Sequence, residues 1–114
     1  MNIGVYGTLR EGCGNHVLLN SVELVAEGRL DGWAMLTNGS FPTIVKAEGK
    51  SVLVEVYDCD DQRVGRLNLL EGYPTFYRRE KVELRDGTQC EVYVCNNPDN
   101  FRGVIESGDW RDGV

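Results

Sequence analysis

One segment constrains the fold most, because it carries both the start and the stop signals of a helix. Asp60 and Asp61 suit the helix start, where their side chains can accept hydrogen bonds from free backbone N–H groups. Gly72 suits a left-handed cap at the end, and Pro74 prevents the helix from continuing. We therefore expect one regular helix over residues 60–71.

An acidic side chain falls on the apolar face of this helix. At 100° per residue, Glu71 shares a stripe with Val64, Leu67 and Leu70, whereas Leu69 points away. Burial and the negative end of the helix dipole both disfavour a charged carboxylate, so both raise its pKa. Glu71 is therefore a candidate general acid or base. The alternative is that it turns outward at a frayed helix end and is solvated.

Composition excludes several kinds of partner. The net charge of -6, from 18 acidic and 12 basic residues, argues against nucleic acid and anionic membranes. No apolar run approaches the roughly 20 residues of a membrane span, and the start of the chain does not have the pattern of a secretion signal. The length of 114 residues is typical of one domain, so we expect a single domain over 1–114.

The cysteines and the one histidine indicate a protein without a metal site. The 4 cysteines show no CxxC spacing, and His16 stands alone as a histidine, so no zinc site can be assembled from them. Four reduced thiols in a cytoplasmic protein is the simplest interpretation. Nothing in the sequence suggests a large interface. We expect a monomer and leave the oligomeric state open.

The rest of the chain is mostly strand-like. Asn15 is expected to cap a short helix over 16–19, residues 48–50 are expected to turn, and 105–110 are expected to lie across the body of the protein. The sequence predicts strands at 2–6, 22–36, 51–58, 76–84 and 88–95, with a break in the second at Asp31-Gly32. Pro42 favours an extended segment at 41–45, and Arg85-Asp86-Gly87 predicts a hairpin turn between the last two strands. The expected fold class is α+β, with a small mixed sheet curled like a barrel and with one longer and one short helix.

A glycine-rich loop follows the first strand. A phosphate-binding loop of the Walker type is excluded, because Cys13 and Gly14 occupy the positions of its Lys and Ser/Thr. Successive backbone N–H groups at Gly7, Thr8 and Leu9 can still form an anion-binding concavity, which would suit a carboxylate as well as a phosphate. The alternative is a plain turn with Gly7 at positive φ.

Short motifs recur in the order of a known family along nearly the whole chain. They are Val5-Tyr6-Gly7-Thr8-Leu9-Arg10, Gly14-Asn15-His16, Phe41-Pro42, Val54-Glu55-Val56-Tyr57, Leu70-Glu71-Gly72-Tyr73-Pro74, Tyr77-Arg78-Arg79 and Glu106-Ser107-Gly108-Asp109-Trp110. In these motifs the chain resembles the gamma-glutamylcyclotransferase-like proteins, and among them the gamma-glutamylamine cyclotransferases and their small bacterial homologues. The resemblance implies a small barrel-like fold with one cavity. The chain departs from the family at Gly72-Tyr73.

The resemblance also implies roles for individual residues. Glu71 matches the catalytic carboxylate, and Tyr77 lines the same cavity. The residues that hold the glutamyl end of the substrate are Tyr6, Gly7, Thr8 and Leu9. For each tyrosine, the alternative is a core aromatic ring with its hydroxyl at the surface. Glu55 is a rival carboxylate, unless it pairs with Arg or Lys on a neighbouring strand.

The implied activity is a cyclotransferase reaction of the acyltransferase or lyase type. The α-amine of a small γ-glutamyl substrate attacks its own γ-carbonyl, releasing 5-oxoproline and an amine, with Glu71 as acid and base and with no cofactor. The alternatives are a binding module that uses the same cavity for a small molecule or a peptide end without turnover, and a scaffold without a ligand. The sequence does not identify the leaving amine.

Overall fold

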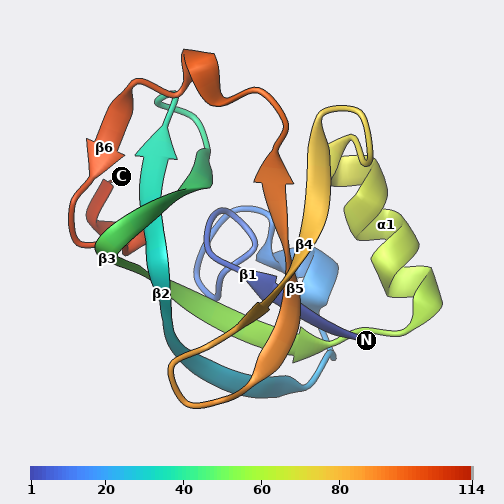
Figure 1. Cartoon of the computed structure of the whole chain (residues 1–114). Coiled ribbons are helices and arrows are strands. Elements are labelled where there is room, and N and C mark those ends of the chain that lie inside the picture. Colours follow the sequence, from blue (N-terminus) through green and yellow to red (C-terminus); the bar gives the residue numbers. More distant parts are fainter. Residues whose placement is uncertain (114) are drawn as a thin grey trace.

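The computed structural model describes residues 1–113, and its centre is a mixed six-stranded sheet in the order β4-β5-β1-β3-β2-β6. Figure 1 shows the sheet curled into a half-barrel, with one α-helix outside it beside β4. The elements are β1 (Asn2–Val5), η1 (His16–Leu19), β2 (Leu24–Thr37), β3 (Pro42–Asp58), α1 (Asp61–Glu71), β4 (Tyr77–Glu83), β5 (Gln89–Cys95), η2 (Pro98–Asn100), β6 (Gly103–Ile105) and η3 (Trp110–Gly113). The expected α+β class is confirmed.

The long β2–β3 hairpin produces the curl. Its register shifts between Asp31 and Trp33, so residues 47–50 of β3 lie opposite Gly32 alone. Gly32 (φ 87°) and Gly49 (φ 81°) take left-handed conformations that a residue with a Cβ adopts at a cost. The expected break at Asp31-Gly32 is confirmed. The expected turn at 48–50 is wrong, because these residues form a bulge inside one continuous strand.

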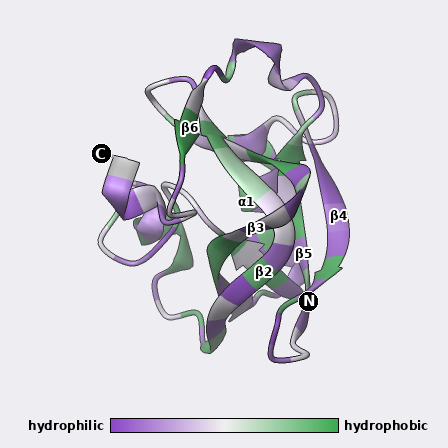
Figure 2. Ribbon diagram, turned by 60° about the vertical axis from the view of Figure 1, so that its left-hand side comes forward, coloured by the Kyte–Doolittle hydropathy of each residue, from purple (hydrophilic) through white to green (hydrophobic). Residues whose placement is uncertain are grey.

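The two faces of the sheet bury different apolar clusters. Val52, Val54 and Val56 pack inside the curl, and Tyr57 packs on the opposite face with the helices, as the alternation of β3 predicts. The sheet edge at β4 reads Tyr-Arg-Arg-Glu-Lys-Val-Glu and is largely hydrophilic in Figure 2. Charged side chains on an edge strand discourage pairing with another chain.

Helix α1 begins and ends at the expected positions. The side chain of Asp60 accepts a hydrogen bond of 2.8 Å from the backbone N–H of Arg63. Gly72 has φ 62°, and the N–H of Tyr73 donates to the carbonyl of Asn68 over 2.9 Å, as in a Schellman cap. These caps fix the last helical residue, Glu71, without help from the rest of the fold.

The faces of α1 follow the helical projection except at one residue. Val64 and Leu67 are buried, and Leu69 is 84% exposed, as expected. Leu70 is 42% exposed, so its expected burial is wrong. It lies with Glu71 at a cavity rather than inside the core. No helix in residues 1–113 combines the length and the apolar character needed to cross a bilayer.

Candidate active site

A cavity of about 270 Å³ opens where the end of β1, the start of β3 and the end of α1 approach one another. Its lining contains all 6 residues to which the sequence assigns a role in the site, namely Tyr6, Gly7, Thr8, Leu9, Glu71 and Tyr77. Their roles in binding and catalysis stay predictions. The other lining residues are Gly4, Val5, Asn15, Ser40, Phe41, Pro42, Leu70, Phe76 and Tyr93.

Glu71 is the acid of this cavity. It is the last residue of α1, it is partly buried, and no ion pair or hydrogen bond of its side chain occurs among the described residues. Burial disfavours the charged form and raises the pKa of Glu71 from 4.5 to about 7. A solvated carboxylate at a frayed helix end does not fit this position. Near neutral pH, Glu71 can both accept and return a proton.

The glycine at the start of the loop is required by close packing rather than by its φ. A Cβ on Gly7 would lie 2.6 Å from Cγ of Pro42, which is far inside contact distance. Gly7 is absent from the positive-φ residues of the described chain, so the expected alternative of a plain turn with Gly7 at positive φ is wrong. The loop therefore lies directly against the first residue of β3.

The loop leaves a row of backbone N–H groups free of its own turn hydrogen bonds. Within residues 1–113, its turns use the N–H groups of Arg10, Cys13 and Asn15, which donate to the carbonyls of Gly7, Arg10 and Thr8. The side chain of Asn15 donates to Oγ1 of Thr8 over 2.9 Å instead of capping η1. The N–H groups of Gly7, Thr8 and Leu9 take no part in these turns and are available to an anion.

Two buried tyrosines form walls of the cavity. The hydroxyl of Tyr6 donates to the carbonyl of Tyr93 over 2.5 Å, and the hydroxyl of Tyr77 donates to the carbonyl of Pro42 over 2.9 Å. Burial is the largest cause that raises the pKa of both phenols, so both are neutral at physiological pH. Their hydroxyls are thus not at the surface, and their oxygens can accept a hydrogen bond from a ligand.

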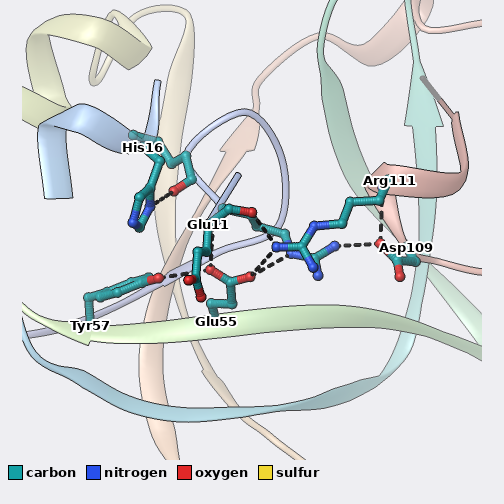
Figure 3. A network of polar contacts seen from close by, with 8 residues as sticks. Glu11, His16, Glu55, Tyr57, Asp109 and Arg111 are labelled. Carbon is teal, nitrogen blue, oxygen red and sulfur yellow. Dashed lines mark hydrogen bonds and ion pairs between the residues drawn. The ribbon is translucent and has the colours of Figure 1, made fainter. Parts of the chain in front are cut away.

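Glu55, the rival carboxylate, lies outside the cavity in a buried ion pair. Glu55 is 1% exposed and is absent from the cavity lining. Its Oε2 lies 3.0 Å from Nε of Arg10, and its Oε1 accepts hydrogen bonds from the hydroxyl of Tyr57 and the N–H of Glu11 (Figure 3). The pairing alternative is correct, although the partner comes from the loop rather than from a neighbouring strand.

The same network joins the loop to the C-terminal tail. Nη1 of Arg10 lies 2.5 Å from Oδ1 of Asp109, and Nη2 of Arg111 lies 3.5 Å from Oε2 of Glu55. Figure 3 shows the side chain of Arg111 extending toward Glu55, and Asp109 lying farther from it. Arg10 is itself 1% exposed, so the charges compensate one another inside the protein. Sequence reasoning missed this role of Arg10, because its partners lie 45 and 99 residues away.

Sequence reasoning also missed part of the cavity wall. Ser40, Phe41 and Phe76 line it, and the rings of Phe41 and Phe76 stand 6.3 Å apart in an edge-to-face arrangement. The resemblance marked Phe41 only as part of a motif. No local pattern brings Phe76 to the same place, because Phe41 and Phe76 precede β3 and β4, two strands that are not adjacent in the sheet.

Metal-ligating side chains do not gather in this region. Residues 1–113 contain no group of three or more His, Cys, Asp or Glu side chains placed to hold a metal ion. The 4 cysteines are all free, and Cys90 and Cys95 pack in different apolar clusters on opposite faces of the sheet.

The fold and the site together define the class of this protein: a small curled α+β fold with one acid in a mostly apolar cavity and without a metal cluster in the described residues. Comparison with known proteins gives the family. Residues 3–112 match the family model described as "Gamma-glutamyl cyclotransferase, AIG2-like". The chain belongs to this family, as its motifs predict.

Relatives of similar length support the assignment. The chain is 36% identical over 113 residues to a protein of Methanocaldococcus jannaschii provisionally named a gamma-glutamylcyclotransferase, with 95% of this chain and 93% of the relative covered. It is 31% identical over 112 residues to the gamma-glutamylcyclotransferase family protein YtfP of Escherichia coli, with 98% and 97% covered.

Solved structures share the fold. The crystal structure of an uncharacterized Pyrococcus horikoshii protein superposes with a TM-score of 0.84 at 31% identity, over 98% of this chain and 91% of that one. The crystal structure of a mouse AIG2-like protein superposes with a TM-score of 0.78 at 22% identity, over 95% and 86%. At that identity the second likeness shows the fold alone.

Proposed function

We propose that this protein is a γ-glutamyl cyclotransferase that converts a small γ-glutamyl compound into 5-oxoproline and an amine. One observation carries the proposal. Glu71 has no side-chain partner among residues 1–113, has a pKa raised to about 7, and shares a small cavity with the free N–H groups of Gly7, Thr8 and Leu9. Membership of the cyclotransferase family supports the same reaction.

The glutamyl end binds at the loop. No Lys, Arg or His side chain lines the cavity among the described residues, so the α-carboxylate is held by the backbone N–H groups of Gly7, Thr8 and Leu9. The α-ammonium lies beside Glu71 and donates to the phenol oxygens of Tyr6 and Tyr77. A charged pair inside the cavity is stronger than in water, because the surrounding dielectric is low.

The chemistry is one ring closure with the transfer of two protons from the attacking nitrogen to the leaving nitrogen. Glu71 accepts a proton from the α-ammonium, and the free amine attacks the γ-carbonyl carbon of the same molecule. The new C–N bond closes the five-membered lactam as the bond from the γ-carbon to the leaving nitrogen breaks. Glu71 returns this proton to the leaving nitrogen, then takes the second proton from the ring nitrogen and passes it to the released amine, which departs as an ammonium. The balance closes without an oxidant, a reductant or a second substrate.

The decisive experiment measures 5-oxoproline release from γ-glutamyl amides by the wild type and by Glu71→Gln. We expect kcat/KM to fall by about 10²–10⁴-fold in the variant, the usual contribution of a positioned acid–base group. Leu69→Ala changes an exposed side chain of the same helix and should leave activity unchanged. Full activity in Glu71→Gln together with its loss in Glu55→Gln would show that the catalytic acid is misassigned.

The dependence on pH tests the same group. With increasing pH, kcat/KM should rise through about 7 as Glu71 ionises, and it should fall above about 8 as the free substrate loses the proton of its α-ammonium. The rise near pH 7 should vanish in Glu71→Gln, and the remaining activity of the variant should instead rise near pH 8, where the substrate amine deprotonates in solution. Thermal stabilisation by 5-oxoproline without any turnover would instead support the binding module.

A further inference from the structure

We propose that the amine released from the substrate carries an apolar, uncharged substituent, as an alkylamine or arylamine does, rather than a carboxylate or a second ammonium. The inference rests on the proposed function and names the leaving group of that same site. It is carried by the composition of the open end of the cavity.

The cavity has a buried end and an open end. Tyr6, Tyr77 and Tyr93 line the buried end, and all three are nearly inaccessible to solvent. The open end is marked by the lining residues that reach solvent, among which Phe76 is 49% and Leu70 is 42% exposed. These two apolar side chains therefore belong to the part of the lining that faces solvent.

The leaving group must lie at the open end. The N–H groups and Glu71 hold the two α-substituents of the glutamyl part, so the γ-amide points away from the loop. A cavity of about 270 Å³ is small compared with pockets for drug-sized ligands, which begin near 300 Å³, and the glutamyl part alone occupies much of it. The substituent on the leaving nitrogen therefore contacts Leu70, Phe76 and Phe41.

The open end provides apolar contact and no positive charge. Phe41 packs edge-to-face on Phe76, and the remaining exposed lining residue is Ser40, which is uncharged. Among the lining side chains in residues 1–113, Glu71 is the only Asp, Glu, Lys, Arg or His, and its charged form is negative. An amino acid as leaving group would bring a carboxylate to this end without a cation to meet it.

The two arginines that directly follow Tyr77 in the chain are already engaged. The guanidinium of Arg79 donates to Asn68 over 2.8 Å and stacks 4.4 Å from the ring centroid of Tyr73. Arg78 donates to the carbonyl of Cys95, and neither arginine lines the cavity. A second ammonium on the leaving group would also be desolvated between phenylalanines, while Glu71 is paired with the α-ammonium.

The test uses three γ-glutamyl amides of nearly equal length that differ in the end of the leaving group. They are the amides of n-butylamine, of β-alanine and of 1,3-diaminopropane. We expect kcat/KM for the butylamide to exceed that of either charged amide by about tenfold or more, mainly through KM, because buried methylene groups and an avoided charge desolvation both act on binding. Equal or better turnover of either charged amide overturns the inference while the proposed function stands.

A charge introduced at the open end gives a matched comparison. Ser40→Lys places a cation there and should raise kcat/KM for the β-alanine amide several-fold relative to the butylamide. Leu69→Lys adds the same charge to the outer face of α1, outside the cavity, and should leave the ratio unchanged. An equal change of the ratio in both variants would overturn the assignment of the open end.

Failure of the proposed function has a different signature. It would appear as no 5-oxoproline from any of the three amides. In that case the thermal stabilisation of the wild type by each amide decides the inference. The largest stabilisation by the butylamide supports an apolar subsite, and equal or absent stabilisation overturns it.

Discussion

Replacement of Glu71 by glutamine should make the protein more stable at neutral and alkaline pH, although it removes the proposed catalytic group. The reason is the unpaired, partly buried carboxylate, which is easier to ionise in the unfolded chain than in the cavity. Glutamine has nearly the same shape and no charge to desolvate. The variant therefore keeps the packing of the helix end and loses the electrostatic penalty.

The magnitude follows from the pKa. Each pKa unit corresponds to about 1.4 kcal/mol, so the rise from 4.5 to about 7 costs the folded, ionised protein about 3 kcal/mol. Because the folded pKa is raised, the protonated carboxyl stabilises the folded state relative to the ionised one. This stabilisation is fully present below pH 4.5 and is lost as the pH rises through about 7. Between pH 5 and pH 8 the wild type should lose about 2.5 kcal/mol at Glu71, and residual exposure of the side chain reduces this figure toward about 2 kcal/mol.

The assay is urea unfolding of both proteins at pH 5 and pH 8. The advantage of Glu71→Gln over the wild type should be about 2 kcal/mol larger at pH 8, with the same dependence on urea concentration in both proteins. Other titrating groups act on both proteins and cancel in the comparison. Glu48→Gln alters an exposed glutamate and serves as the control for the substitution itself. An advantage that is the same at both pH values would refute the burial of an unpaired charge at Glu71.

Three further predictions concern the loop, the buried network and the thiols. Gly7→Ala should lower the free energy of unfolding by about 1–3 kcal/mol and raise KM, because its Cβ would overlap the proline ring behind it, whereas Gly14→Ala has no atom within 4 Å of its Cβ and should do neither. Glu55→Gln breaks the buried pair with Arg10 and should cost about 3 kcal/mol in urea unfolding, yet the carboxylate limb of the pH profile should remain near pH 7; its disappearance would implicate Glu55 in the chemistry. Iodoacetamide should label Cys13 in the native protein and all 4 cysteines after denaturation, and native labelling of a buried cysteine, observed by mass spectrometry, would contradict the described packing.

The sequence predicted what depends on neighbouring residues. The ends of α1 are fixed by Asp60 and Gly72, which act through hydrogen bonds and φ angles within a few residues. The alternation along β3 and the turn at 85–87 are equally local, and the structure contains both the two-faced strand and the β4–β5 hairpin. Helical periodicity is also a local property, and it therefore predicted that Glu71 lies on the apolar side of the helix end.

The motifs added what local rules lack. Nothing in the spacing of Tyr6 and Glu71 says that they share a cavity, and the resemblance to the family placed them together before the fold was known. Local reasoning alone left the loop open between an anion site and a plain turn. It explained Gly7 by its φ, whereas the structure explains it by contact with Pro42.

Tertiary structure alone decided the rest. Two expected strands became one β3, because pairing with β2 on both sides of the bulge outweighs the local turn signal at Gly49. Glu55 became half of a buried ion pair, and Leu70 became part of the rim of a cavity, through residues far away in sequence. Burial, charge pairing and the shape of a cavity depend on which surfaces meet, and a periodic pattern shows only that a surface is apolar, not what lies against it.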